Sequence, residues 1–424
     1  MSAAPTRLDE AVQRAGQAMA AGRADEAARL WQLVLSQSPD NPQALLHLGQ
    51  IALQKRDIAA ARGFLERAAK SAPQNPVIPL NLSYAARAAG DSDGELAALT
   101  RALTIDPYFY PALLAKGMLM ERTGQTREAA RVYRNVLKIA PPADQLPPPL
   151  KAPLAHAADV VRDNAAAMER FLDGRMSPVR AQFPEANWSR LDECRDIAAG
   201  VKRAYTVEPH MLHVPRLPAI QFYDEADFPW LKDLEAASDA MREEFLAVYG
   251  KDNEGFVPYI DYPDGTPVNQ WVELNRSPRW SVFYLWKDGK KVEANCARCP
   301  KSVEAMKAVP LADIPNFAPT VLFSLLAPKT TIPAHTGDTN ARLIVHLPLI
   351  VPEGCRFRVG NETREWKVGK AWVFDDTIDH EAWNDSDELR VIVMIDIWNP
   401  YLNEAERAMA REILNGVRDY FAHG

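Results

Sequence analysis

The chain of 424 residues is poor in cysteine, with only Cys194, Cys296, Cys299 and Cys355. Four thiols in a chain of this length cannot form the disulfide scaffold of small secreted domains, so a reducing compartment fits best. No stretch reaches the roughly 18 consecutive apolar residues of a membrane-spanning helix. The first residues do not have the basic and then apolar order of a secretory signal peptide. We therefore expect a soluble, cytoplasmic protein without a membrane span.

The sequence also lacks an excess of positive charge. Lys and Arg number 49 against 56 Asp and Glu, which gives a net charge of -7. No overall attraction therefore draws the chain to nucleic acid or to an anionic membrane. Apolar residues make up 47% and charged residues 25%, the balance of folded globular domains. At roughly 100 to 200 residues per domain, the length predicts two or three domains.

A period of 34 residues runs through the first third of the chain. Prolines, small residues and bulky apolar residues all recur at this spacing and in the same phase. The four series are Pro39, Pro73, Pro107 and Pro141; Ala15, Gly49, Ser83 and Gly117; Ala27, Ala61, Glu95 and Ala129; and Trp31, Leu65, Leu99 and Tyr133. Because the four series coincide, an accidental periodicity in an all-α bundle is the weaker interpretation.

This pattern resembles the tetratricopeptide repeat, a pair of helices joined by a tight turn. Small side chains let the two helices approach closely, bulky residues fill the gap to the next unit, and proline ends the second helix. Glu95 breaks the small-residue rule, which puts the packing of the third unit in question. The resemblance implies a docking surface for a peptide or protein partner. The predicted units are 8–41, 42–75, 76–109 and 110–143, with Gly22, Gly90 and Gly124 in the turns.

A proline-rich stretch, PPADQLPPPLKAP, follows the repeats. Such a composition favours extended, semi-rigid chain. The sequence therefore predicts a repeat solenoid over 1–143, a linker over 144–154 and a second domain over 155–424, which opens with a helix from Ala155 to about Leu172.

The last third of the chain changes to a period of two. In ARLIVHLPLI and LRVIVMIDIW, polar or charged residues alternate with apolar ones, which predicts strands with one polar face. Further short apolar segments separated by Gly360-Asn361 and Gly369-Lys370 suggest an antiparallel double-sheet barrel or jelly roll. The predicted fold class is therefore multidomain α+β, an all-α solenoid followed by a double-stranded β-helix. The histidines His335, His346 and His380 cluster in this region.

Three segments of this region, PAHTGDTNARLIVHLPL, GCRFRVGNETREWKVGKAWVFDDTIDHEAWN and LRVIVMIDIWNP, are similar to the aspartyl/asparaginyl β-hydroxylase family. The resemblance implies an oxygenase that depends on Fe(II), 2-oxoglutarate and dioxygen. It places His335 and His380 at the two iron-ligand positions. A carboxylate that many related oxygenases carry two residues after the first histidine is replaced here by Gly337, as it is in the resembled family.

The resemblance also implies the residues that bind the cosubstrate. Arg390 stands where the family has an arginine that grips the distal carboxylate of 2-oxoglutarate, and guanidinium matches a carboxylate bidentately. Ser324 matches a hydroxyl donor to the same carboxylate, and His346 matches the residue beside the iron-chelating end. Asp376 matches an acid that orients ligand water.

One position departs from the animal enzymes, where an arginine stands in place of Ile344. Arg342 lies two residues earlier on the same strand face. Either Arg342 takes over as a cosubstrate-binding residue, or the contact to an acidic substrate is lost. Asp338 is expected to be a turn residue, and Asp375 and Asp379 are expected to cap a turn.

Two further groups are left open by the sequence. Cys296 and Cys299 have the spacing of half a zinc site or of a redox pair, but no second pair exists, so a structural dithiol is the simpler interpretation. Trp271, Trp280 and Trp286 would suit either a pocket wall or the core.

These features predict a dioxygenase that hydroxylates a side chain, Asp or Asn among the candidates, of a peptide or protein docked by the repeats. Two alternatives remain. The chain could be an interaction module whose barrel is degenerate, or it could hydroxylate a lipid or a small metabolite.

Overall fold

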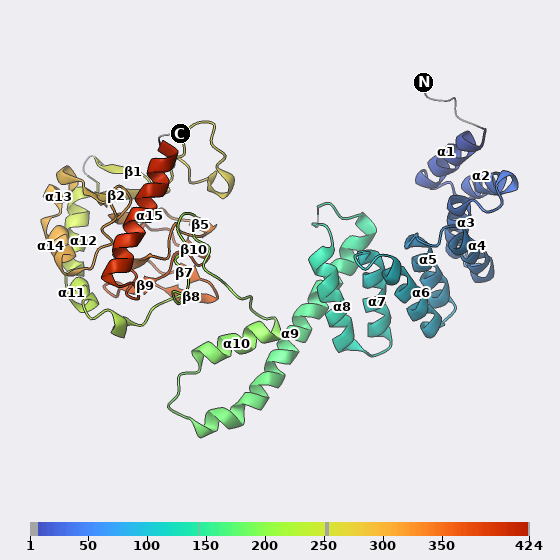
Figure 1. Ribbon diagram of the computed structural model, residues 1–424, viewed down its shortest axis with the longest axis horizontal. Coiled ribbons are helices and arrows are strands. Elements are labelled where there is room, and N and C mark those ends of the chain that lie inside the picture. Colours follow the sequence, from blue (N-terminus) through green and yellow to red (C-terminus); the bar gives the residue numbers. More distant parts are fainter. Residues whose placement is uncertain (1–6, 143, 251–253, 423–424) are drawn as a thin grey trace. The chain divides into compact units, whose positions relative to one another are not determined.

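The structure is a computed structural model that describes residues 7–142, 144–250 and 254–422. The chain divides into two compact units, the first ending at Val201 and the second beginning at Lys202. Residues 1–6 and 143 of the predicted solenoid and linker boundary, and residues 251–253 and 423–424 of the predicted oxygenase domain, lie outside the described residues. Figure 1 shows the helices and strands of each unit.

The first unit begins with consecutive helix pairs that match the predicted repeats, one pair in each 34-residue unit (Figure 1). Each of the prolines Pro39, Pro73, Pro107 and Pro141 follows two residues after the second helix of its pair ends. Gly22, Gly90 and Gly124 have φ angles of 69°, 75° and 79° in the turns between paired helices, a backbone conformation that glycine adopts without strain. The helices are α1 (Arg7–Ala20), α2 (Ala24–Gln37), α3 (Pro42–Gln54), α4 (Ile58–Ser71), α5 (Val77–Ala88), α6 (Ser92–Ile105), α7 (Tyr110–Arg122) and α8 (Thr126–Ile139).

The small and bulky series meet inside each pair. A Cβ atom at Gly49 would lie 2.6 Å from Cγ of Leu65, and a Cβ atom at Gly117 would collide with the ring of Tyr133. Leu65 and Tyr133 are fully buried. The predicted close approach of the helices is therefore confirmed.

Glu95, the exception in the small-residue series, is buried on α6 and only 2% exposed. Its carboxylate accepts a hydrogen bond from Nη2 of Arg122 at 2.5 Å. Arg122 belongs to the next helix, α7. The buried negative charge of Glu95 is therefore neutralised across the interface between two repeats.

The predicted proline-rich linker differs from the structure, because most of it is helix. α9 (Pro148–Gln182) begins inside the predicted linker and contains Pro153 and Pro178. Leu146, Leu154 and Ala157 pack against the last repeat, and α10 (Ser189–Ala199) completes the unit. The last repeat of a solenoid has an apolar face that a capping element must cover. Proline does not prevent such a helix from beginning here, because it is tolerated in the first turn. The domain boundary therefore lies near residue 201 and not near 155.

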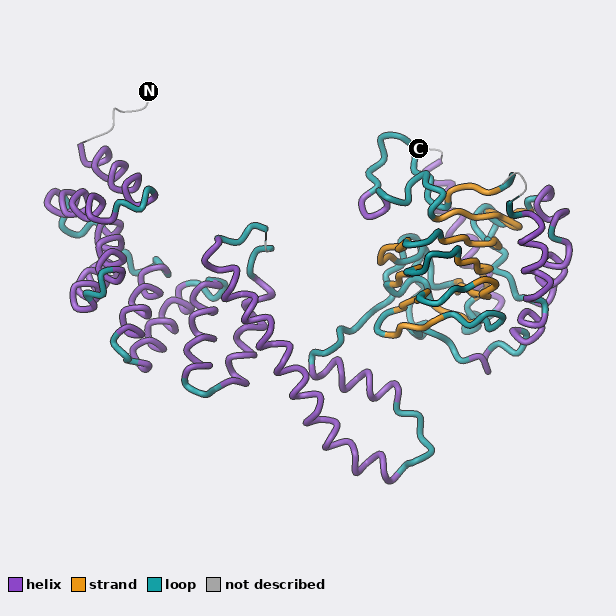
Figure 2. The backbone as a smooth tube through the Cα atoms, turned by 180° about the vertical axis from the view of Figure 1, so that it is seen from behind, coloured by secondary structure: helices purple, strands orange, loops and turns teal. Residues whose placement is uncertain are grey.

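The second unit contains two antiparallel sheets (Figure 2). Within the described residues, the pairs β4–β11, β5–β10, β6–β9 and β7–β8 are nested in sequence order, which is compatible with the predicted jelly roll. The first sheet has the order β1 (Phe256–Pro258), β2 (Trp280–Lys287), β4 (Val321–Leu326), β11 (Arg390–Trp398), β6 (Arg342–Ile350), β9 (Trp372–Phe374), with β3 (Lys290–Lys291) on β2; the second has β5 (Thr330–His335), β10 (His380–Asn384), β7 (Cys355–Val359), β8 (Glu362–Glu365).

The larger sheet is covered on both faces. Leu343, Val345 and Leu347 point to an outer core shared with helices, whereas Ile344 packs in the inner core that the two sheets share. The predicted alternation of β6 and β11 is thus confirmed. The outer face is covered by α11 (Leu231–Ala236), α12 (Ser238–Val248), α13 (Glu293–Arg298) and α14 (Pro300–Ala305), and α15 (Glu404–Ala422) ends the unit.

Cys296 and Cys299 lie in the outer core, buried and without a disulfide. Burial raises the pKa of both thiols, that of Cys299 to about 12. These are inert thiols in an apolar environment, which agrees with the simpler interpretation. Among the described residues, no helix combines the length and the apolar character needed to cross a membrane. The cytoplasmic location stays a prediction.

The contact between Gly117 and Tyr133 generates a stability prediction. Gly117→Leu should lower the free energy of unfolding by about 1 to 3 kcal/mol, because the added side chain overfills the gap between α7 and α8. The matched control is Gly63→Ala in α4, where a Cβ atom meets nothing within 4 Å. That change should leave stability unchanged or raise it by up to about 1 kcal/mol. Urea unfolding followed by helical circular dichroism checks both; equal effects would contradict the packing described.

Candidate active site

A pocket of about 620 Å³ opens into the space between the two sheets of the second unit. The structure brings all the predicted site residues to its wall, although they are spread over the sequence and over both sheets. They are Ser324, His335, Arg342, His346, Asp376, His380 and Arg390.

His335 and His380 face each other at one end of the smaller sheet. His335 ends β5, His380 begins β10, and the two residues are partners in the antiparallel ladder. Their ring centroids are 4.1 Å apart. Nδ1 of His335 lies 2.7 Å from the carbonyl oxygen of Pro333, and Nδ1 of His380 lies 3.0 Å from that of Ile378. A carbonyl only accepts, so each Nδ1 carries the proton and each Nε2 keeps a free lone pair.

Both rings are neutral at neutral pH. Burial, and then the neighbouring His380, lower the pKa of His335 to about 3. Burial lowers the pKa of His380 to about 4. Two neutral imidazoles with available Nε2 atoms are donors that suit Fe(II), and their Nδ1 bonds to carbonyls are the outer contacts typical of ligating histidines.

The described residues place no third protein ligand beside this pair. Among the described residues, no group of three or more His, Cys, Asp or Glu side chains is arranged to hold a metal ion. At Gly337, where a carboxylate would complete such a group, a Cβ atom would collide with the carboxylate of Asp376. The donor set therefore fits a metal that keeps most of its coordination positions open for other ligands.

Arg390 is buried at the opposite end of the pocket, with 1% of its surface exposed. Its Nη1 lies 3.3 Å from the carbonyl oxygen of Ser324 and 3.4 Å from Oγ of the same residue. Nε has no hydrogen-bond partner, and within the described residues no carboxylate pairs with the guanidinium. Burial lowers the pKa of Arg390 to about 10, so the side chain remains a cation at neutral pH. A buried charge of this kind needs a counter-ion.

His346 lies on β6 between these two ends and is 4% exposed. Burial, together with Arg390 and His380, lowers its pKa well below the ordinary value. Its ring packs between Phe357 and Phe374, with centroids 4.9 Å and 4.7 Å away. The neutral ring leaves Nδ1 buried without a hydrogen-bond partner in the part of the chain that the structure describes.

Arg342 is already paired with acids. Its Nη1 lies 3.1 Å from Asp376 and 3.3 Å from Asp396. Although burial alone would lower it, these two carboxylates raise the pKa of Arg342 above its usual range. Burial raises the pKa of Asp376, and Arg342 opposes this rise. For Arg342 to bind a cosubstrate it would have to exchange one of these partners.

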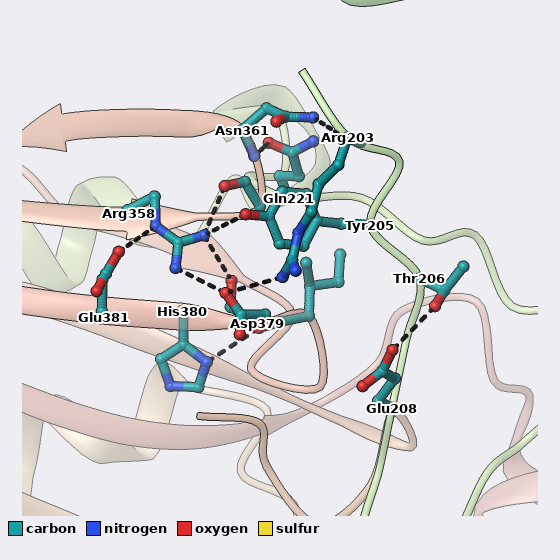
Figure 3. Close-up of polar contacts among 12 residues, drawn as sticks. Arg203, Tyr205, Thr206, Glu208, Gln221, Arg358, Asn361, Asp379, His380 and Glu381 are labelled. Carbon is teal, nitrogen blue, oxygen red and sulfur yellow. Dashed lines mark hydrogen bonds and ion pairs between the residues drawn. The ribbon is translucent and has the colours of Figure 1, made fainter. Parts of the chain in front are cut away.

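The expected turn-capping role of Asp375 agrees with its contacts. Its Oδ1 accepts hydrogen bonds from the backbone N–H and the hydroxyl of Thr377, at 2.9 Å and 2.5 Å. Asp379 instead belongs to a polar network on the outer side of the smaller sheet (Figure 3). There Arg358 donates to Asp379 at 2.6 Å, to Glu381 at 2.5 Å and to the carbonyl oxygen of Gly360 at 2.7 Å.

A segment at residues 203–214, which we call the strap, holds the two loops that follow β5 and β9. The backbone N–H of Glu208 donates to the carbonyl oxygen of Thr377 at 2.7 Å, and that of His210 donates to Gly337 at 3.0 Å. Near its start, Tyr205 stacks with Arg203 and accepts a hydrogen bond from Arg358 (Figure 3). The strap therefore joins the loop that follows His335 to the loop that precedes His380.

The sequence left Trp271, Trp280 and Trp286 open between a pocket wall and the core, and the first two line the pocket. Trp280 donates from Nε1 to Oγ of Ser324 at 3.1 Å, and Trp271 packs edge-on against His335. The sequence did not single out Asp396 or the strap. Trp286 points to the outer core, because an irregularity in β2 between Tyr284 and Trp286 shifts the register. Alternation along neighbouring strands, counted from Ser324, would identify Asp396 and Trp280 as candidates for the pocket wall. This count requires the pairing of β4 with β11 and β2, which the sequence does not give.

The network around Arg358 predicts a cost for its loss. Arg358→Met should lower the free energy of unfolding by about 1.5 to 3 kcal/mol, because it removes charge-assisted bonds, leaves Glu381 without its cation and leaves Asp379 with only the more distant Arg203, at 3.7 Å. Arg356→Met is the matched control, since Arg356 is on the same face of β7 but pairs with Asp385 with 45% of its side chain exposed. It should cost at most about 1 kcal/mol. Hydrogen exchange should quicken at residues 375–380 only in the Arg358 variant; equal protection would contradict a clamping role.

Comparison with known proteins gives the two parts of the chain separate relatives. Residues 235–400 match the sequence model of a family described as aspartyl/asparaginyl beta-hydroxylase, and residues 18–78 and 111–142 match tetratricopeptide-repeat models. A thermophilic TPR protein of Thermus thermophilus aligns with 46% of this chain and 99% of its own at 19% identity, with a TM-score of 0.32.

Curated relatives are hydroxylases by name. The human aspartyl/asparaginyl beta-hydroxylase is 27% identical over 415 residues, which cover 91% of this chain and 52% of the relative. The ornithine lipid ester-linked acyl 2-hydroxylase of Rhizobium tropici is 34% identical over 187 residues, 43% of this chain and 62% of the relative. The chain thus matches about half to three fifths of the length of these two relatives. The chain carries an aspartyl/asparaginyl β-hydroxylase family domain behind N-terminal tetratricopeptide repeats.

Proposed function

We propose that this protein is an Fe(II)- and 2-oxoglutarate-dependent dioxygenase that hydroxylates a peptide or protein substrate. The observation that carries the proposal is a buried cation without a counter-ion, Arg390, in the same pocket as two neutral histidines that face each other. A dianionic cosubstrate that bridges from the histidine pair to Arg390 would satisfy both features. The family match and the names of the relatives support hydroxylation as the reaction.

His335 and His380 would hold the iron through Nε2, because their Nδ1 atoms already donate to backbone carbonyls. Bound Fe(II) supplies oxygen activation, in which one oxygen atom of dioxygen enters a substrate C–H bond and the other enters succinate as 2-oxoglutarate loses CO₂. The chain's own residues bind and orient the reactants. Trp271 packs against His335 and keeps one side of the imidazole ring of His335 out of water.

Arg390 and Ser324 would bind the distal carboxylate of 2-oxoglutarate, with Trp280 fixing the hydroxyl of Ser324 from the other side. The neutral His346 would donate or accept a hydrogen bond beside the iron-chelating end. Arg342 is the weaker cosubstrate ligand, because Asp376 and Asp396 already neutralise it. Asp376 would orient a water molecule at the coordination position that Gly337 leaves open.

The repeats favour a peptide or protein substrate, since a solenoid offers more binding area than a small molecule requires. A second candidate, hydroxylation of a lipid, is favoured by the similarity to the ornithine lipid hydroxylase. A third, an interaction module with an inactive barrel, would require the site residues to have no ligand.

A binding experiment separates these functions. The full-length protein should bind Fe(II) and 2-oxoglutarate without oxygen, giving the visible charge-transfer absorption of that complex, and should release succinate when oxygen is admitted. Absence of both signals would favour the interaction module. Identification of the oxidised product as a peptide or as a lipid then separates the first two candidates.

The histidine pair predicts an all-or-none dependence on each ring. His335→Ala or His380→Ala should abolish iron binding, because two protein ligands leave no redundancy, while the fold is retained. Bound iron is measured by the absorption of the 2-oxoglutarate complex, and circular dichroism reports the fold. A band of full strength in either variant would sink the ligand assignment.

Arg390→Met should weaken 2-oxoglutarate binding roughly 10- to 150-fold, the loss expected for a charge-assisted bond of about 1.5 to 3 kcal/mol. Iron affinity without the cosubstrate should change much less. Titration of 2-oxoglutarate against the absorption band measures this. An unchanged cosubstrate affinity would move the carboxylate site away from Arg390, with Arg342 the first residue to test.

A further inference from the structure

The wall of the pocket that β11 provides has opposite charges at its two ends. Arg390 begins this strand and Asp396 stands near its end, both on the inner face. Ile392 and Met394 lie between them and also line the pocket. Because Arg390 is assigned to the cosubstrate under the proposed function, the other end remains for the substrate.

Among the described residues that line the substrate end, the one buried cation, Arg342, is already paired with acids. Arg342 lies there between Asp376 and Asp396, at 3.1 Å and 3.3 Å. Asp396 is only 5% exposed, and its Oδ2 also accepts a hydrogen bond from the backbone N–H of Thr320 at 2.8 Å. Ile344, across the ladder from Asp396, adds an apolar side chain. A carboxylate buried here would meet Asp376, Asp396 and an arginine that these two acids already neutralise.

The same end holds carboxylate oxygens that lack partners. Asp376 is 6% exposed and lines the pocket, and its Oδ1 has no hydrogen-bond partner within the described residues. Asp338 also lines the pocket and forms no ion pair with any described residue; its backbone carbonyl is held by the N–H groups of Met211 and Leu212 in the strap. Asp338, Asp376 and Asp396 thus outnumber Arg342, the buried cation of this end.

The remaining lining residues agree with this charge. Apart from Arg390, the pocket wall has three cations, Lys287, Arg342 and Arg418, against five aspartates, residues 261, 288, 338, 376 and 396, of which Asp261 is paired with Arg276. Lys287 and Arg418 are exposed, and Arg418 donates to the carbonyl oxygen of Asn316. Aromatic side chains, which attract cations through their ring faces, complete the wall: Tyr259, Tyr262, Trp271 and Phe317.

We propose that the acidic end of the pocket, formed by Asp338, Asp376 and Asp396 with the aromatic wall, binds a positively charged group of the substrate. Such a group is an ammonium or guanidinium on an alkyl chain, as in a basic side chain. The cation pairs with the partnerless carboxylate of Asp338, and its alkyl part lies along the aromatic wall and Ile344. This inference rests on the proposed function, because that function assigns Arg390 to the cosubstrate.

The test compares three probes of equal length and different charge: n-butylammonium, n-butanol and butyrate. The full-length protein is loaded with Mn(II), whose unpaired electrons broaden the proton resonances of bound probes, and with saturating 2-oxoglutarate, which occupies Arg390. We expect butylammonium to bind at least about 10-fold more tightly than butyrate, with butanol between them. Asp338→Asn should reduce this ratio to less than about 3-fold. Asp239→Asn is the control and should leave the ratio unchanged, because Asp239 is an exposed residue of α12 that pairs with Arg242.

The outcomes separate this inference from the proposed function. If the protein fails to bind Mn(II) and 2-oxoglutarate, the proposed function is wrong. If it binds both, any one of four results would overturn the cationic site. These are tighter binding of butyrate than of butylammonium, equal binding of the three probes, binding of none of them, and an unchanged ratio in Asp338→Asn. Asp396→Asn provides a second, buried variant; it should lower the ratio in the same direction if it folds, as judged by circular dichroism.

Discussion

The antiparallel pairing of β5 with β10 is the constraint on which the site depends. It sets His335 opposite His380 at the end of a sheet, with their ring centroids 4.1 Å apart. Since successive strand residues point to opposite faces, a slip of one residue in this ladder would turn one histidine away from the pocket. The strap and the network of Arg358 act from outside the ladder, and they fix the loops at the point where a sheet end would otherwise fray.

Burying polar groups between the two sheets costs folding free energy, and these groups line the pocket where ligands would bind. Arg390, His346 and Asp376 all have buried polar atoms without hydrogen-bond partners. Each such atom destabilises the folded state by about 1 to 3 kcal/mol, because it loses hydrogen bonds to water and gains none within the protein. The outer face of the larger sheet packs in a continuous apolar core, whereas its inner face mixes apolar residues with the buried polar side chains of the site. The outer face therefore serves stability alone, and the inner face combines packing with chemistry.

Local patterns predicted what depends on local geometry. The 34-residue series located every described repeat helix pair, because proline stops a helix and small residues are needed where helices cross. Alternation in β6 and β11 identified the inner faces. The linker prediction was wrong because it rested on proline content alone. The helix in this segment buries Leu154 against the last repeat, a contact that the composition does not reveal. Contacts such as Trp280 with Ser324, or the strap with Gly337, join residues far apart in sequence, and no local pattern contains them.

The glycine at 337 shows how the missing ligand and the acidic end of the pocket depend on each other. The space that a side chain at 337 would occupy is filled by the carboxylate of Asp376, which is also a partner of Arg342. An aspartate at 337 would have to displace Asp376, and Arg342 would then keep only Asp396. The third protein ligand and the Asp376–Arg342 pair thus compete for one volume. The fold has room for a donor set of two histidines with a neutralised Arg342, or for three ligands with a partly unpaired arginine, but not for both.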